Sequence, residues 1–345
     1  MNLSEAQKRF LPQIEAEMRR VMSPPAGQSD AFFGMMHYHL GWLDEHFAPA
    51  QASAGKRLRP LFTLLACRAA GGEPERALPA AAAVELVHNF SLVHDDIQDN
   101  SDTRRGRPTV WRLWGMPQAI NAGDAMFVLA RHALLRLSER GVSPPTVLNA
   151  VARLDRTCLT LCRGQYLDMD FEGRLDVRLA DYLEMIEAKT AALLACAGYL
   201  GGLVATEDPA RAETFWSLGR ALGLAFQIQD DWLGIWGEER ITGKPAADDL
   251  RRRKKSLPVV YALGRAAEDE RAARFRALYA QPHRAEETVS EAIALLEATG
   301  AKEYTEQQAR RHAEAARAAL QAVDAPPGSG EALQEMVQFM IERAY

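Results

Sequence analysis

Helical periodicity runs through most of this sequence and is the feature that most constrains its fold. Apolar residues recur every three or four positions in segments rich in Ala, Leu, Glu, Arg and Met, a spacing typical of α-helices. These segments span residues 60–71, 78–99, 118–138, 145–171, 179–204, 208–236, 256–280 and 284–322. The sequence lacks alternating Val, Ile, Thr and aromatic runs bounded by hairpin turns, so it gives a sheet little support. The pattern predicts an all-α fold.

Short breaks that contain Gly and Pro separate the segments, and none is long enough to be an interdomain linker. We therefore expect residues 1–345 to form a single large helical bundle, although this length suggests about two domains. Residues 78–93 and 190–204 are apolar nearly all round, which predicts helices at the centre of the bundle. Residues 237–258 are highly charged and interrupted by Gly and Pro, so we expect a mobile basic lid there.

Charge and cysteine content argue against several classes of protein. The 41 basic and 46 acidic side chains give a net charge of −5, without the basic excess of a nucleic-acid-binding protein. Four cysteines do not make a disulfide scaffold in so long a chain, and they indicate a reducing compartment. The N-terminal segment is unlike a signal peptide, and residues 77–93 are too short and polar to span a bilayer. We expect a cytoplasmic protein without stable membrane insertion.

The first chemical signal lies at the end of an apolar helix, in the segment VELVHNFSLVHDDIQD. His88, Asp95 and Asp99 fall in one narrow stripe of that helix, and Asp96 lies beside them. Ordinary surface acids at a solvated helix end would give the same pattern. The apolar turns before the cluster and the basic segment SDTRRGRPT after it favour a functional cluster, since neighbouring carboxylates repel unless something positive meets them.

A second acidic cluster occurs in the segment LAFQIQDDWLGIW. Gln227, Asp230, Asp231 and Gly234 share one face of a second predicted helix, whose remaining surface is apolar. Two acidic clusters on buried helices suggest one cavity between facing helices. Oxygen ligands without a His or Cys cluster indicate a hard ion such as magnesium, which takes one or two carboxylates together with substrate phosphates. The sequence therefore predicts a phosphorylated ligand that is bridged by metal.

Basic residues that suit such a ligand are present near the clusters and along the chain. They are Lys56, Arg57 and Arg59 in the segment GKRLRP, Arg104 and Arg105 after the first acidic cluster, and Lys189, Lys244, Lys254 and Lys255 further along. Each of them alone is more often a solvated surface charge than a ligand. GKRLRP also lacks the spacing of a P-loop, so a P-loop nucleotide site is not predicted.

Together these residues resemble the motifs of the trans-isoprenyl diphosphate synthases, the polyprenyl synthetase family. The match runs in order through GKRLRP, His88, DDIQD, RRG, Lys189-Thr190, FQIQDD, TGKP and KKS, over about residues 50–260. The resemblance implies an all-α bundle around a central cavity, dependence on Mg²⁺ and a homodimer. It also implies a prenyltransferase that condenses isopentenyl diphosphate head to tail with dimethylallyl, geranyl or farnesyl diphosphate.

The resemblance also implies roles for the residues at the matching positions. Mg²⁺ would be held by Asp95, Asp99 and Asp230, with support from Asp96 and Asp231. The allylic diphosphate would be bound by Arg104, Lys189 and Lys244. Isopentenyl diphosphate would be bound by Lys56, Arg59, His88 and Arg105. The reacting centre would be lined by Thr190 and Gln227, and Lys254 would close over the substrates from the lid.

The implied chemistry needs no dedicated protein base. Magnesium and cationic side chains neutralise the charge on the departing diphosphate, which favours ionisation of the allylic carbon–oxygen bond. The double bond of isopentenyl diphosphate attacks the allylic cation, and the released pyrophosphate takes the proton that is lost. Water would trap the cation, so exclusion of water is the function expected of the lid.

Two details of the motifs bear on activity and product. Gly234 replaces the last acid of the DDxxD pattern found in many relatives, and we expect activity to survive because the leading pair and Gln227 remain. Product length depends in this family on positions before the first Asp, which here are Val87, Phe90 and Ser91. A bulky ring beside a small serine resembles short-chain synthases, with geranylgeranyl diphosphate favoured and farnesyl diphosphate next. Phe90 as an ordinary core aromatic fits equally well.

Two other functions share part of this pattern. A terpene cyclase on the same fold needs no isopentenyl diphosphate site, and the intact residues Lys56, Arg59, His88 and Arg105 argue against it. A non-catalytic regulatory subunit of a heteromeric synthase is expected to lose carboxylates from the first cluster, which is complete here. A nucleic-acid role lacks a recognition motif, and the run RRRKK is better explained as part of the lid.

Overall fold

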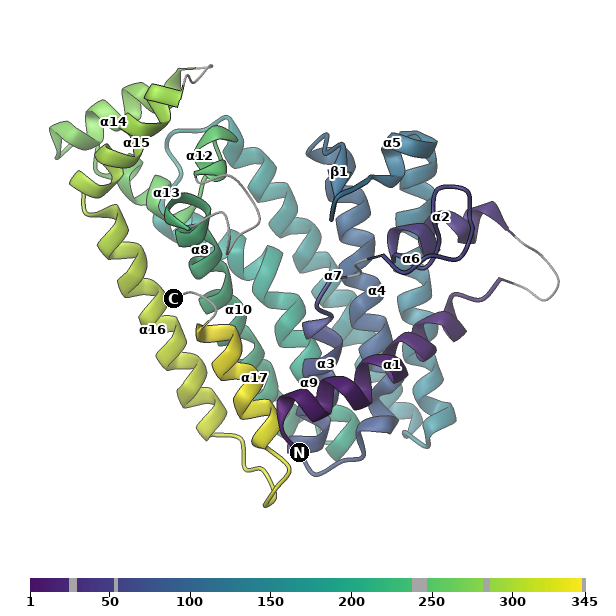
Figure 1. Ribbon diagram of the computed structural model, residues 1–345. Helices are drawn as coiled ribbons and strands as arrows, with labels where there is room; N and C mark the ends of the chain where they lie inside the picture. The colour runs from purple at the N-terminus through teal and green to yellow at the C-terminus, as the bar shows by residue number, and fades with distance from the viewer. Residues whose placement is uncertain (25–29, 53–54, 238–246, 282–285, 343–345) are drawn as a thin grey trace. The chain divides into compact units, whose positions relative to one another are not determined.

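The computed structural model describes residues 1–24, 30–52, 55–237, 247–281 and 286–342 (Figure 1). Helices dominate these residues, and the strands among them form one short two-stranded hairpin. The prediction of an all-α fold is therefore confirmed. Contacts along the chain divide it into two compact units, and the single domain over residues 1–345 stays a prediction.

The first unit contains residues 1–155, 196–216 and 323–335. Its own elements are α1 (Leu3–Val21), α2 (Ala31–His39), α3 (Leu58–Ala69), η1 (Pro74–Ala77), α4 (Leu78–Gln98), β1 (Thr103–Arg104), β2 (Arg107–Pro108), α5 (Val110–Trp114), α6 (Met116–Leu135) and η2 (Arg136–Arg140). Helix α4 is buried over most of its length and packs against α6, α3 and α1. Its position agrees with the apolar pattern of residues 78–93, which predicts a helix surrounded by other helices.

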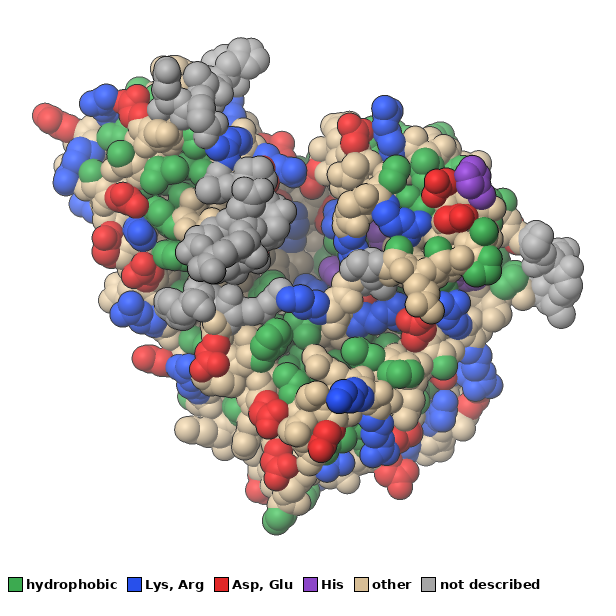
Figure 2. Space-filling view, viewed as in Figure 1, with side chains coloured by type: hydrophobic (Ala, Val, Ile, Leu, Met, Phe, Trp, Pro, Cys, Tyr) green, Lys and Arg blue, Asp and Glu red, His purple; other side chains and the backbone are tan. Residues whose placement is uncertain are grey.

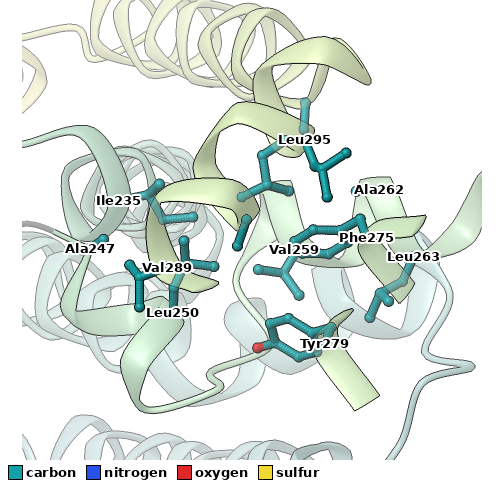
Figure 3. Packing of buried hydrophobic residues seen from close by; sticks show 13 residues of the cluster. Ile235, Ala247, Leu250, Val259, Ala262, Leu263, Phe275, Tyr279, Val289 and Leu295 are labelled. Carbon is teal, nitrogen blue, oxygen red and sulfur yellow. The ribbon is translucent and has the colours of Figure 1, made fainter. Parts of the chain in front are cut away.

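The second unit contains residues 156–195, 217–322 and 336–345. Its own elements are α8 (Leu179–Ile186), the π-helical turn η3 (Glu187–Ala191), α12 (Asp248–Arg251), α13 (Leu257–Gly264), α14 (Glu270–Ala280), α15 (Glu286–Ala298) and α16 (Ala301–Gln321). The helices with residues in both units are α7 (Pro144–Glu172), α9 (Ala192–Thr206), α10 (Pro209–Trp236) and α17 (Glu331–Glu342). An apolar cluster joins the end of α10 to α12, α13, α14 and α15 (Figure 3).

Two predicted helices are wrong in extent, because each is divided in the structure. Segment 256–280 forms α13 and α14, and Asp269 begins α14 by accepting a hydrogen bond from the N–H of Arg271. Segment 284–322 is interrupted at Gly300, whose φ of +78° is a left-handed conformation that glycine adopts without steric cost. The helices α1, α2, α5 and α17, the short turn η1 and the hairpin lie outside the predicted segments.

Among the described residues, one helical run, Leu179–Thr206, is long and apolar enough to cross a membrane. In its most apolar stretch 83% of the residues are buried, and the core helix of a soluble protein has the same properties. The run is therefore weak evidence for a membrane span. On the face that Figure 2 presents, basic and acidic side chains are interspersed, as expected for a chain with a small net charge.

Residues 238–246 of the predicted lid lie outside the described residues, and Lys244 is among them. The described remainder consists of Gly237 and residues 247–258, and the latter contain α12 and the beginning of α13. Ala247, Leu250 and Ser256 are buried there, so this part of the segment is packed into the second unit. Mobility of the lid stays a prediction.

Candidate functional site

The first acidic cluster lies at the C-terminal end of α4, where Asp99 is the C-cap residue. Asp95 is half-buried, Asp96 is buried and Asp99 is exposed. Asp96 accepts a hydrogen bond of 2.8 Å from Nε of Arg104, and Nη2 of Arg104 lies 2.7 Å from the same carboxylate oxygen. Burial raises the pKa of Asp96 to about 6, although the charge of Arg104 acts in the opposite direction. Arg104 therefore fixes the carboxylate of Asp96, whereas the side chain of Asp99 is exposed to solvent.

The hairpin β1–β2 places two arginines beside this cluster. Arg104 pairs with Arg107 across the hairpin, and both turn residues, Arg105 and Gly106, have positive φ values of 54° and 77°. Such two-residue turns with positive φ match the natural twist of a hairpin. Gly55 has a positive φ of 83°, a conformation that favours glycine, and Nη2 of Arg105 lies 2.9 Å from the place where a Cβ at Gly55 would be.

A buried carboxylate opposes the positive charge of this region. Glu85, two turns or more before the acidic cluster on α4, is 2% exposed, and its Oε1 accepts a hydrogen bond of 3.1 Å from Nδ2 of Asn89. Burial raises the pKa of Glu85, and the charges of Arg57, Arg59 and Arg105 oppose that shift. Glu85 was missed in the sequence, although an acid inside an apolar run is the signal that marks such a residue.

The arginines of this region keep unused hydrogen-bonding capacity. Nε of Arg59 and Nη1 of Arg105 are buried and have no hydrogen-bond partner among the described residues. Burial, followed by the charges of Arg59 and Arg105, lowers the pKa of His88 well below its ordinary value, so its ring is neutral at pH 7. Buried donors without partners call for an explanation, and a bound anion supplies one. Lys56, by contrast, is exposed.

A pocket opens beside these groups in the first unit. It is lined by Tyr38, His39, Asp96, Arg104, Arg105, Arg107, Pro108, Thr109 and Val110. Tyr38 and Arg107 form part of its frame, because the hydroxyl of Tyr38 donates to the carbonyl of Pro108 and Arg107 donates to the carbonyl of Tyr38. The predicted residues Asp96, Arg104 and Arg105 therefore meet at one pocket whose lining is rich in guanidinium groups.

The second acidic cluster lies near the end of α10, within the second unit. Asp230 is exposed, whereas Asp231 is 0% exposed. The carboxylate of Asp231 accepts hydrogen bonds from the hydroxyl of Tyr182, from Nε2 of Gln227 at 3.1 Å and from the backbone N–H of Leu257 at 2.8 Å. Burial raises the pKa of Asp231 to about 6, against the charge of Lys254. Asp231 thus ties α8 and the start of α13 to α10.

The predicted Thr190 and Gln227 meet in the same region. The hydroxyl of Thr190 donates to Oε1 of Gln227 at 2.7 Å, and the amide of Gln227 in turn contacts Asp231. Lys254 is close as well, with its Nζ 3.6 Å from a carboxylate oxygen of Asp231. Burial alone would lower the pKa of Lys254, but the neighbouring carboxylates raise it above its ordinary value. The lysine is therefore charged.

Lys189 lies on the π-helical turn η3, and its ammonium pairs with Asp168 on α7. A Cβ at Gly164 would lie 2.3 Å from the backbone nitrogen of Lys189, so the glycine lets α7 approach this turn closely. π-Helical turns often occur at functional sites. Asp168 and Tyr182 were missed in the sequence, because their partners lie 21 and 49 residues away and no local spacing marks them.

The predicted chain-length residues lie on α4 in the first unit. Val87 and Phe90 are buried, and the ring of Phe90 packs edge-on against Phe127 of α6 at a centroid distance of 5.1 Å. Ser91 is half-buried, and its hydroxyl donates to the carbonyl of His88. The contact with α6 agrees with both interpretations of Phe90, as a floor of the cavity or as a core aromatic.

The donor chemistry fits Mg²⁺. Asp99 and Asp230 present exposed carboxylates to which none of the described residues donates a hydrogen bond. Within the described ranges no group of three or more His, Cys, Asp or Glu residues is arranged to hold a metal alone. The exposed carboxylates of Asp99 and Asp230 suit Mg²⁺, which combines one or two carboxylates with water and with phosphate oxygens of a ligand. The roles of Asp95, Asp99 and Asp230, and a cavity that they share, stay predictions.

Comparisons with known proteins agree with these motifs. Residues 41–296 match the polyprenyl synthetase family. The chain is 41% identical over 314 residues to (2E,6E)-farnesyl diphosphate synthase of Mycobacterium tuberculosis, covering 90% of this chain and 85% of that one. It is 44% identical over 287 residues to geranylgeranyl diphosphate synthase of the same organism, covering 83% and 80%.

Solved structures give the same result. A polyprenyl synthetase from Streptomyces coelicolor superposes with a TM-score of 0.86 at 37% identity, covering 98% of both chains. Geranylgeranyl pyrophosphate synthase from Corynebacterium glutamicum, solved with isoprenyl diphosphate and magnesium, superposes with a TM-score of 0.81 at 28% identity, covering 99% of this chain and all of that one. The resemblance therefore extends over nearly the whole chain, well beyond residues 50–260.

Proposed function

This chain belongs to the polyprenyl synthetase family, and we propose that it is a trans-prenyltransferase that condenses isopentenyl diphosphate with an allylic diphosphate. The observation that carries the proposal is a pair of half-buried arginines in the first unit whose guanidinium groups keep buried donor atoms without partners. Nε of Arg59 and Nη1 of Arg105 are these donors, and Arg105 lines the same pocket as Asp96. A prenyltransferase binds two diphosphate substrates, so it needs such a cationic site for isopentenyl diphosphate in addition to the metal site for the allylic diphosphate. A terpene cyclase binds only one diphosphate substrate and does not need this second site.

The chain's own residues would divide the work between binding and charge stabilisation. Arg59 and Arg105 would hold the diphosphate of isopentenyl diphosphate by charge-assisted hydrogen bonds. Arg104 and Lys189 would stabilise negative charge that develops on the departing allylic diphosphate. Both groups are held in advance by carboxylates, Arg104 by Asp96 and Lys189 by Asp168, so little reorganisation is needed when the carbon–oxygen bond breaks. The released pyrophosphate would accept the final proton.

We propose Mg²⁺ as the cofactor, since the synthase from Corynebacterium glutamicum was solved with magnesium. Asp95 and Asp99 on α4 and Asp230 on α10 would hold it. When bound, it neutralises negative charge on the diphosphate and so makes that group a better leaving group. The remaining predicted site residues would bind substrate. Lys56 and His88 would act with the arginines, and Lys254, which lies beside Asp231, would act at the second acidic cluster. Lys244 would bind the allylic diphosphate and lies outside the described residues.

The test is incubation of the purified chain with Mg²⁺, isopentenyl diphosphate and each of three allylic primers, followed by chromatography of the dephosphorylated products. We expect linear prenyl alcohols longer than the primer. Cyclic hydrocarbon formed from geranylgeranyl diphosphate alone would instead indicate a terpene cyclase. Absence of any product, together with stimulation of an added active synthase, would indicate a regulatory subunit. We propose geranylgeranyl diphosphate as the main product and farnesyl diphosphate as the next choice.

Phe90→Ala is expected to lengthen the main product by at least one isoprene unit. Removal of the ring opens space about one and a half helical turns before Asp95 on α4, where the growing prenyl chain would end. The measurement is the chain-length distribution of the products. Phe62→Ala on α3 removes another buried ring and serves as the control. Both variants are expected to lose stability, as large-to-small core substitutions do. A longer product in Phe90→Ala but not in Phe62→Ala would therefore identify Phe90 as the residue that closes the substrate cavity. An unchanged distribution would make Phe90 an ordinary core residue.

We also propose that the chain forms a homodimer and that it is located in the cytoplasm. Along α7, Leu148, Leu159 and Tyr166 lie within about 20° of one another around the helix and are 68%, 74% and 66% exposed. An exposed apolar stripe of this kind is typical of a protein–protein interface.

Leu159→Glu is expected to convert the dimer to a monomer, because it places a charge in the middle of the stripe on α7. Size-exclusion chromatography with light scattering gives the mass. Leu113→Glu on α5 is the control, since Leu113 is also an exposed leucine but lies off the stripe. A monomeric parent chain, or a dimeric Leu159→Glu variant, would contradict α7 as the interface.

A further inference from the structure

The middle cation of the segment GKRLRP is directed toward α1. Arg57 is 8% exposed, and its Nη2 lies 3.1 Å from Oε2 of Glu15 on that helix. Its Nη1 donates to the sulfur of Met18 at 3.2 Å. The two other cations of the segment are more accessible, since Lys56 is exposed and Arg59 is half-buried. The guanidinium of Arg57 is therefore engaged with the protein, although the sequence groups it with residues that suit a phosphorylated ligand.

The backbone at Arg57 has an unusual conformation. Its φ of 46° and ψ of 41° lie in the left-handed region, which a residue with a Cβ adopts only where its surroundings hold it there. The contacts of its guanidinium with α1 supply such a hold. Arg57 is the N-cap residue of α3, and its side chain makes no capping hydrogen bond. The turn at this residue sets the direction in which α3 begins, with Arg59 in its first turn and Lys56 immediately before the turn.

The carboxylate of Glu15 is itself fixed from its other side. Nε and Nη2 of Arg19, one turn later on α1, donate to Oε1 of Glu15 at 3.2 and 2.9 Å. The guanidinium of Arg19 also packs over the ring of Trp42, at 4.2 Å from the ring centroid. Arg57 meets the second oxygen, Oε2, so each oxygen of Glu15 faces one arginine. Because α1 packs against α3 and α4, Glu15 is a fixed point to which the start of α3 is attached (Figure 1).

The charge of Arg57 also acts on the buried acid of α4. Among the arginines that oppose the rise in the pKa of Glu85 caused by burial, Arg57 has the largest effect, ahead of Arg59 and Arg105. Arg57 therefore lies between an acid of α1 and an acid of α4. A shift of its guanidinium would change the charge balance around Arg59 and Arg105, the residues proposed to bind isopentenyl diphosphate.

We infer that Glu15 and Arg57 form an anchor that positions the segment GKRLRP for isopentenyl diphosphate. Neither residue touches the substrate, and their ion pair holds the turn that presents Lys56 and Arg59. The inference rests on the proposed function, because it needs the site for isopentenyl diphosphate in the first unit. Loss of the anchor then weakens the binding of this substrate and spares the allylic diphosphate, whose proposed ligands lie on other segments.

The test measures KM for each substrate by steady-state kinetics, and binding of isopentenyl diphosphate to the full chain by titration calorimetry. Glu15→Ala is expected to raise KM and Kd for isopentenyl diphosphate by about 10- to 100-fold, because a misplacement of about 1 Å can have an effect of this size. KM for the allylic primer is expected to stay unchanged. Glu75→Ala is the matched control, since it removes an exposed ion pair with Arg9 on the same helix α1. We expect this control to keep the constants of the parent chain.

Arg57→Gly separates the contribution of the side chain from that of the backbone turn. Glycine adopts the left-handed conformation without steric cost, so the turn stays allowed while the ion pair is lost. We expect this variant to bind isopentenyl diphosphate as weakly as Glu15→Ala, and the double variant to bind no more weakly than either single variant. Arg57→Lys, which keeps a cation next to Glu15, is expected to recover part of the binding.

Parent-like binding of isopentenyl diphosphate by Glu15→Ala or by Arg57→Gly would overturn the anchor. An equal rise of KM for both substrates would overturn it as well, because it indicates a general disturbance of the fold. A parent chain that binds isopentenyl diphosphate but forms no prenyl diphosphate would refute the proposed function alone, since the binding comparison still tests the anchor. A parent chain that does not bind isopentenyl diphosphate would refute both.

Discussion

Asp99→Ala is expected to lower kcat/KM for prenyl transfer by about 10³-fold while the melting temperature stays the same or rises slightly. Asp99 is exposed at the C-terminal end of α4, and none of the described residues donates a hydrogen bond to its side chain. Loss of one group that stabilises charge on a departing diphosphate costs about 10²–10³ in rate, and loss of a metal ligand adds to this. A negative charge at a helix C-terminus opposes the helix dipole, so its removal does not destabilise the fold.

The measurement combines steady-state kinetics at saturating Mg²⁺ with thermal unfolding. Asp102→Ala is the matched control, because Asp102 is an exposed acid three residues further along the chain that pairs with Arg112. We expect this control to keep the activity of the parent chain. An Asp99→Ala variant with activity within tenfold of the parent would show that the end of α4 does not hold the metal.

Asp231→Ala is expected to reduce the free energy of unfolding by about 3–5 kcal/mol, the range for removing one partner of a buried ion pair. The change leaves the hydroxyl of Tyr182, the N–H of Leu257 and the ammonium of Lys254 without their common acceptor. Urea denaturation followed by circular dichroism measures the loss. Asp231→Asn keeps one acceptor oxygen, so its loss is expected to be smaller.

Asp230→Ala provides the contrast for this prediction. Asp230 is the exposed neighbour of Asp231, so its removal is expected to abolish activity without a change in stability. Equal stability losses in the Asp230 and Asp231 variants would refute the division of the motif into an exposed functional acid and a buried structural acid. The same difference in exposure is found on α4, where Asp99 is exposed and Asp96 is buried against Arg104.

Helical periodicity predicts most of the fold because apolar spacing is a local property of the chain. The predicted segments 78–99 and 208–236 differ from α4 and α10 by one residue at one end. The break between α15 and α16 depends on a positive φ at a single glycine, which a periodic pattern does not reveal. Helix α2 was missed because its sequence, AFFGMMHYH, is apolar on nearly every side and shows no clear stripe.

The candidate site was predictable where one helix carries several of its residues. Spacing along α4 and α10 is enough to place Asp95, Asp99 and Asp230 on those helices. Residues that act across elements were missed, among them Glu85, Asp168 and Tyr182. The sequence also does not distinguish Asp230 from Asp231. Their adjacent positions do not show which carboxylate accepts hydrogen bonds from Tyr182 and Leu257.

The most direct measurement is a crystal structure of the full chain with Mg²⁺ and an allylic thiodiphosphate that cannot ionise. We predict one diphosphate whose metal ions are bound by Asp95 and Asp99 on one side and by Asp230 on the other. Ligands bound by only one of these aspartate sets, with the other set turned toward solvent elsewhere, would contradict metal-assisted prenyl transfer at a shared site.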